Sequence, residues 1–308
     1  MTLTCLSAIT TIGLAIMLLL VMPRDQIPQI PDVQDDFPLQ KKREFTQQKV
    51  DLENTRSKLH HRIDDFNNRC KNVDDGSEED MKCQKEAAQL EAEKEKYSKA
   101  VVDFGKEMRA TPIVLRLTND SNQRDAYNYA RVIDQLQVST NWRYAVSEEG
   151  NTHCNIFAWD VTRAMGCEIP HWVNKNDPRA SSAIDQDGGF IVKKEDAEEL
   201  VVNATVDWLN KHGKEHGWKQ ISTPEPQNLA QNFANQGHPT IAIWENTRST
   251  HGHIAVVRPG SIGWLDKNGQ VGGDAEAQAG GLVKNAIHLV EGFNMKDSNK
   301  SIQYWYHD

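Results

Sequence analysis

The sequence predicts an α+β domain, with helices packed on an antiparallel sheet, that follows a transmembrane helix and an antiparallel coiled-coil hairpin. Three observations predict this order. Residues 2–22 carry no charge and are rich in Leu, Ile and Met. Two stretches between residues 40 and 109 have apolar residues at helical spacing, and all eight Trp residues lie beyond them, which is typical of a compact domain with its own core.

The apolar N-terminal segment, residues 1–22, is expected to be a single-pass membrane anchor, because about 20 apolar residues cross the hydrocarbon layer as a helix. A cleaved signal peptide is the alternative, but a positive n-region is missing and no small-x-small site precedes Pro23. Arg24, directly after the segment, is a weak signal of one residue for a cytoplasmic body under the positive-inside rule.

Residues 23–39 are rich in Pro, Gln and Asp and are expected to form an extended tether. Residues 40–109 then repeat an apolar seam twice, which predicts two antiparallel helices. Gly76 breaks the helix between them, and Ser77 with Asp80 is a capping pair for the restart. We expect the hairpin to act as a spacer or to dock a partner protein. The predicted seam residues are Phe45, Leu52, Leu59, Ile63, Phe66, Cys70, Leu90, Tyr97, Val101, Phe104 and Met108.

Cys70 and Cys83 flank the polar loop at the tip of this hairpin. A disulfide between them would place the protein in an oxidising space, while the alternative is two incidental thiols. We expect the body of the protein to be periplasmic or otherwise extracytoplasmic.

A linker at residues 110–125 leads to the predicted catalytic domain, residues 126–308. Its first half contains two predicted helices, Cys154–Gly166 and about 195–213, and its second half contains short apolar runs with the length of buried strands. Helices followed by strands favour an α+β arrangement. The predicted strands are residues 240–244, 254–257 and 302–306.

Cys154 is the candidate nucleophile, because it follows a polar turn and begins an apolar helix. A sulfur at that place would feel the positive end of the helix dipole, and the first-turn N–H groups could hold an oxyanion. His253 stands at the start of a predicted strand, from which its imidazole can reach a helix terminus as the general base.

Two motifs carry a resemblance: Cys154-Asn155-Ile156-Phe157, and Gly252-His253-Ile254-Ala255-Val256-Val257 with the apolar run 240–244 before it. Over about residues 140–280 they resemble the NlpC and CHAP families of papain-like peptidoglycan hydrolases. The resemblance implies a papain-like domain in which Cys154 attacks an amide carbonyl, His253 takes its proton, and neither a metal nor another cofactor takes part.

The same resemblance implies a third residue that orients the imidazole. Gln278 is the first choice and Asp266 the second, although these families usually have His, Asn or Glu there. Tyr144 resembles the tyrosine that lines the substrate cleft in NlpC-like enzymes, or else it is a core aromatic. Trp142 and Asn155 complete the predicted substrate-binding residues.

Other Cys and His residues near these motifs are interpreted differently. Cys167 has no histidine-bearing strand that would make it a nucleophile, so it is interpreted as a packing residue. His251 is the alternative to His253 as the general base. A metal site at His153, Cys154, Cys167 and His171 is rejected because the spacing fits no zinc pattern. The net charge of −9, without a basic stripe, makes nucleic acid an unlikely partner.

The sequence therefore predicts a membrane-anchored cysteine hydrolase that cleaves an amide bond in peptidoglycan stem peptides through a thioester. Two alternatives stay open. The same pair of residues can act on a protein or lipid amide as a protease or acyltransferase, or the domain is a non-catalytic binding or toxin-like module.

Overall fold

The computed structural model describes residue 22 and residues 27–119, 122, 124–147, 149–185, 189–248, 252–260, 275–293 and 301–308. The chain divides into two compact units: Met1–Asp35 with Leu39–Met108, and Asp36–Pro38 with Arg109–Asp308. Within the described ranges, no helix combines the length and the apolar character that crossing a membrane requires. The predicted anchor lies outside these ranges except for Met22.

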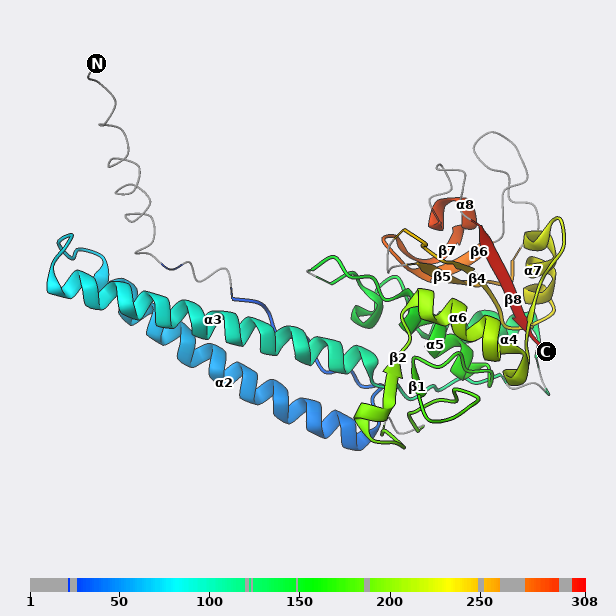
Figure 1. Ribbon diagram of the computed structural model, residues 1–308, viewed down its shortest axis with the longest axis horizontal. Helices are drawn as coiled ribbons and strands as arrows, with labels where there is room; N and C mark the ends of the chain where they lie inside the picture. The colour runs from blue at the N-terminus through cyan, green and yellow to red at the C-terminus, as the bar shows by residue number, and fades with distance from the viewer. Residues whose placement is uncertain are drawn as a thin grey trace, which may run out of the picture. The chain divides into compact units, whose positions relative to one another are not determined.

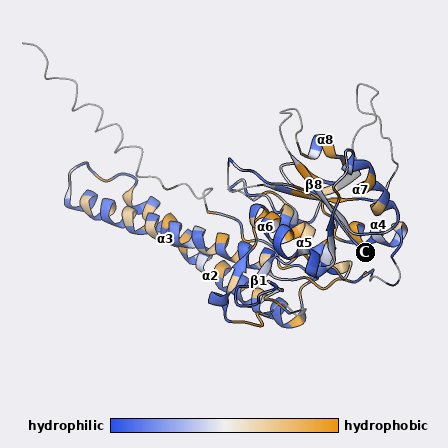
Figure 2. Ribbon diagram, turned by 45° about the vertical axis from the view of Figure 1, so that its right-hand side comes forward, coloured by the Kyte–Doolittle hydropathy of each residue, from blue (hydrophilic) through white to orange (hydrophobic). Residues whose placement is uncertain are grey.

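The first unit is a helical hairpin in which α2 (Leu39–Cys70) and α3 (Glu78–Ala110) lie side by side (Figure 1). The predicted seam is buried along both helices, apart from Leu52, which is partly buried. Both helices are mostly hydrophilic elsewhere (Figure 2), and ion pairs Arg62–Glu93 and Arg69–Glu86 join them. A narrow apolar stripe on a polar helix leaves only one face to pack, so the two stripes meet.

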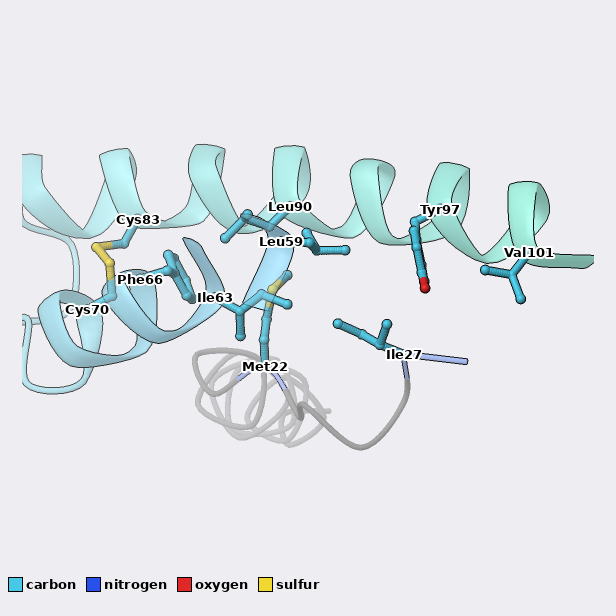
Figure 3. Packing of buried hydrophobic residues seen from close by; sticks show 10 residues of the cluster. All are labelled: Met22, Ile27, Leu59, Ile63, Phe66, Cys70, Cys83, Leu90, Tyr97 and Val101. Carbon is cyan, nitrogen blue, oxygen red and sulfur yellow. A yellow bond between two sulfur atoms is a disulfide. The ribbon is translucent and has the colours of Figure 1, made fainter. Parts of the chain in front are cut away.

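The turn of the hairpin is closed by local hydrogen bonds and by a covalent bond. Ser77 Oγ accepts from the backbone N–H of Asp80 at 3.0 Å, and Asp80 Oδ2 accepts from the N–H of Gly76 at 3.0 Å, so the predicted capping pair forms. Gly76 has a φ of +76°, which favours glycine. Cys70 and Cys83 form a disulfide (Figure 3), which decides between the two alternatives for these thiols.

The N-terminal tether is not free, because Met22 and residues 27–35, here called the strap, pack on the hairpin. Met22 and Ile27 belong to the same buried cluster as the disulfide (Figure 3). The side-chain amide of Asn67 holds both the backbone N–H and the carbonyl of Met22, at 3.0 and 3.2 Å. Met22 was predicted as the last anchor residue, and the structure corrects this: it is part of the hairpin core.

The strap follows α2 in a regular antiparallel register. Its contacts fall three residues apart on the strap and seven apart on the helix: Asp35 with Lys42, Asp32 with Lys49, and Gln29 with Arg56. Three residues of extended chain rise about 9 Å at 3.1 Å per residue, and seven helical residues rise about 10.5 Å. Because these repeats nearly match, one side of the strap faces one side of α2 along its length.

Replacing Ile27 by Ala removes a buried strap side chain, so we expect the free energy of unfolding of the hairpin to fall by about 2 kcal/mol. Val50→Ala is the matched control, because Val50 is exposed on α2 and its loss should change stability by less than about 0.5 kcal/mol. Urea unfolding followed by circular dichroism measures both. Equal stability of the Ile27→Ala and wild-type chains would show that the strap does not contribute to the fold.

The second unit contains a six-stranded antiparallel sheet, which confirms the predicted α+β class with an antiparallel sheet. A separate two-stranded sheet pairs β1 (Trp172–Asn174) with β2 (Ala197–Glu199). The strands of the large sheet, in spatial order, are β3 (Trp218–Gln220), β8 (Ile302–His307), β4 (Thr240–Trp244), β5 (His253–Val257), β6 (Ala275–Ala279) and β7 (Val283–His288).

Helices cover both faces of the sheet centre, since β4 and β5 are buried at every position except one end of each. Helix α5 (Cys154–Ala164) contacts β5 and β6, α6 (Val202–His212) contacts β4, and α7 (Pro226–Asn235) contacts β8 and β4. The remaining helical segments are α4 (Ala126–Gln135), α8 (Leu289–Gly292) and the 3-10 turns Trp142–Tyr144, Lys194–Asp196 and Gly213–His216.

One predicted helix is too long. Residues 195–213 were expected to form a single helix, but α6 begins only at Val202. Residues 197–199 instead pair with Trp172–Asn174 as β2. Pairing with a distant strand thus overrides the helical preference of Ala and Glu in this acidic stretch.

Candidate active site

Helix α5 brings the candidate nucleophile into the core. Cys154 is its first residue and is 3% exposed. Every other residue of α5 is buried except Asn155 and Arg163, so the helix can only sit inside the domain, against β5 and β6. The backbone N–H of His153, just before the helix, donates to Ala279 O on β6 at 3.2 Å. This bond fixes the start of α5 beside the sheet.

The candidate base, His253, is the first residue of β5. Its Nε2 is 2.5 Å from Gln278 Oε1 on β6, and Gln278 is fully buried. Because an amide oxygen only accepts, His253 Nε2 is the donor, which leaves Nδ1 for the thiol of Cys154. The structure therefore brings together Cys154, His253 and Gln278, the three residues predicted as catalytic.

Two further residues hold the imidazole, and neither was found from the sequence. A Cβ at position 280 would lie 2.7 Å from His253 Cε1, so only glycine allows the approach of this backbone. The Phe293 ring packs edge-on against the imidazole with centroids 4.7 Å apart and is 2% exposed. A buried aromatic ring at this place keeps water from the His253–Gln278 bond.

The electrostatics of the site favour the thiolate. Burial by itself raises the pKa of the Cys154 thiol. The hydrogen bond from His253, the charge of that imidazole, and the backbone N–H groups of Ile254 and Asn155 act the other way and prevail, so the pKa lies below its usual value. A lowered thiol pKa is what nucleophilic chemistry by cysteine requires near neutral pH.

Cys167, the other free cysteine in the described residues, has a raised pKa instead of a lowered one. Cys167 is buried without such partners, and burial raises its pKa to about 12, against a weaker opposing effect of Arg124. It is therefore a neutral packing thiol at physiological pH. His153, although adjacent to Cys154, adds no positive charge, because burial together with Arg109 and Arg143 lowers its pKa to about 4.

The predicted substrate-binding residues lie in different surroundings. Tyr144 is fully buried and its hydroxyl donates to Asp160 at 2.8 Å, so the structure corrects its assignment: it is a core residue and does not line a cleft. The Asn155 amide donates to Leu200 O at 3.1 Å and lies 3.4 Å from His171 Nδ1, which commits it to protein contacts. Trp142 is half-buried, with the Arg109 guanidinium 3.9 Å from its ring centre.

A buried ion pair on the helix that carries Cys154 was not predicted from the sequence. Arg143 Nε donates to Asp160 Oδ2 at 2.6 Å, and both side chains are almost completely buried. The signal was a lone acidic residue inside the apolar helix 154–164, since buried charges are normally paired. Asp266 and His251, the second choices for orienter and base, lie outside the described residues.

A scan against protein-family models found no match for this chain, and a search of curated proteins also found none.

The two free thiols should differ sharply in alkylation by iodoacetamide. Because its pKa is lowered, we expect Cys154 to react at pH 7 and to show a rate inflection below the usual pKa of a thiol, about 8.5. Cys167, with a pKa of about 12, should stay unlabelled across the same range. Peptide mass mapping after timed labelling reads each site separately. Equal labelling of both cysteines would contradict the contrast described above.

Replacing Gln278 by Ala removes the acceptor that orients His253. We expect the alkylation rate of Cys154 at pH 7 to fall about tenfold, corresponding to a thiol pKa about one unit higher. Gln278→Glu keeps an acceptor at this place and should retain more of the wild-type rate. A Gln278→Ala chain that is folded and reacts at the wild-type rate would remove Gln278 from the site.

Proposed function

We propose that this protein is a membrane-anchored cysteine hydrolase of papain-like type, which cleaves an amide bond in peptidoglycan stem peptides. The observation that carries the proposal is the thiol of Cys154 at a helix start, hydrogen-bonded to an imidazole that is itself held by Gln278. The motifs around Cys154 and His253, with their resemblance to the NlpC and CHAP families, supply the substrate class.

The first half of the reaction is acyl transfer to sulfur. The Cys154 thiolate attacks the amide carbonyl carbon, a C–S bond forms, and the carbonyl electrons move to oxygen. Backbone N–H groups in the first turn of α5 stabilise that oxyanion. As the C–N bond breaks, the His253 imidazolium gives its proton to the leaving amine, which leaves a thioester on Cys154.

The second half is hydrolysis of the thioester. His253 takes a proton from water, the hydroxide oxygen attacks the carbonyl carbon, and the C–S bond breaks to release the acid and the thiolate. Gln278 Oε1 keeps accepting from Nε2 throughout, so the same imidazole nitrogen, Nδ1, handles the proton in both halves. Sulfur, imidazole and backbone supply every step, so no cofactor is part of the proposal.

The proposed location is extracytoplasmic, with residues 2–21 as the anchor. The Cys70–Cys83 disulfide supports it, because such bonds persist in oxidising compartments. The strap already covers one face of the hairpin, which favours a role for the hairpin as a spacer over docking of a partner on that face.

Digestion of purified muropeptides by the full-length chain in detergent tests the function. We expect two products whose masses sum to that of the substrate plus one water. Cys154→Ala should lower the rate at least 10³-fold, whereas Cys167→Ala should keep it within about twofold. Cleavage that survives in Cys154→Ala would overturn the proposal, and cleavage of protein amides alone would move the chain to the protease alternative.

A further inference from the structure

A short segment between β2 and the first turn of α6, residues 200–203, touches the chain next to both reacting groups. On the nucleophile side, Asn155, which follows Cys154, donates its amide to Leu200 O at 3.1 Å. The Leu200 N–H in turn donates to His171 O at 2.8 Å, which secures the segment itself. The second residue of α5 is thus tied to the chain just before α6.

On the base side, Asn203 holds the loop that leads into β5. Its Oδ1 accepts from the backbone N–H of Asn246 at 3.0 Å, and its Nδ2 donates to Asn246 O at 3.1 Å. Trp244 pairs with His253 in the sheet register, so residues 245–252 form the connection between β4 and β5. One side chain therefore satisfies both backbone groups of a residue at the start of this connection.

Asn203 also packs against the end of the same connection. A Cβ at Gly252 would lie 2.7 Å from Asn203 Oδ1 and 2.3 Å from Trp244 O. Only a glycine fits between these oxygens, and the next residue is His253. The Asn203 amide thus holds the backbone at Asn246 and packs against Gly252.

We propose that Asn203 is a positioning residue, which holds the backbone at Asn246 and packs against Gly252, so that His253 stays at hydrogen-bonding distance from Cys154. This inference rests on the proposed function. Segment 200–203 is tied to the neighbour of the nucleophile through Leu200 and to the neighbour of the base through Asn203. A displacement of His253 away from Cys154 would therefore disturb the packing of Gly252 against Asn203.

Strand β6 makes a second connection of the same kind. Its Ala279 O accepts from His153, the residue before the nucleophile, and its Gln278 accepts from His253. The thiol and the imidazole are therefore linked twice, through β6 and through segment 200–203. Gln278 restrains the imidazole itself, whereas Asn203 restrains the backbone that carries it.

Residues Asn203-Ala204-Thr205 match the sequon for N-glycosylation, but the same contacts engage its side chains. Both polar atoms of the Asn203 side chain are engaged by Asn246, and the Thr205 hydroxyl donates to Val201 O at 3.2 Å. These groups serve the fold, so the sequon is not a modification site in the folded domain.

The test measures the pH dependence of Cys154 alkylation in the full-length chain. Asn203→Ala removes both bonds to Asn246, which loosens His253 and weakens its hydrogen bond to the thiol. We expect the inflection to rise by about one pH unit and the rate at pH 7 to fall about tenfold. Asn210→Ala is the matched control, because Asn210 lies on the same helix and is exposed. It should leave the profile unchanged.

Asn203→Asp is a second variant for the case in which Asn203→Ala does not fold. It has the same shape, keeps the acceptor for the Asn246 N–H, loses only the donor, and should shift the inflection in the same direction. A folded Asn203 variant with the wild-type profile overturns the inference while the proposed function stands. A wild-type chain whose Cys154 shows no lowered inflection overturns the proposed function itself.

Discussion

The proposed chemistry of this domain depends on the hydrogen bond between the Cys154 thiol and the His253 imidazole. Burial alone would raise the thiol pKa, as it does at Cys167, and would leave an inert sulfur. The imidazole and two backbone N–H groups reverse that direction, so the pKa of the Cys154 thiol lies below its usual value despite the burial. A small displacement of His253 would return Cys154 to the state of Cys167, which is why the surrounding contacts matter.

The fold holds this pair by several short connections. Helix α5 is buried nearly all round and cannot rotate without breaking the core, while β6 joins the residue before Cys154 to the partner of His253. Segment 200–203 repeats the connection from another element. The hairpin unit has stabilising contacts of its own, which are its seam, its disulfide and the strap.

Much of this was accessible from the sequence, and the reasons differ between elements. The hairpin seam and the strands at 240–244 and 302–306 follow from local periodicity, which the sequence carries directly. The strap was missed because its contacts recur every three residues on the strap and every seven residues on α2. Such a match is a relation between two segments and is not visible in either segment alone. Segment 197–199 was misassigned as helix since its pairing partner, β1, lies far away in the chain. Asn203 had no signal beyond a sequon, because its partners are backbone atoms of a distant loop.

Nitrogen NMR of the histidine side chains tests the central contact most directly. We expect His253 Nε2 to be protonated at neutral pH, as the donor to Gln278, and the Nδ1 signal to move when Cys154 is replaced by Ala but not when Cys167 is. The opposite outcome, a His253 spectrum that does not respond to the loss of the Cys154 sulfur, would show that the two groups do not interact and would contradict the assignment of this site.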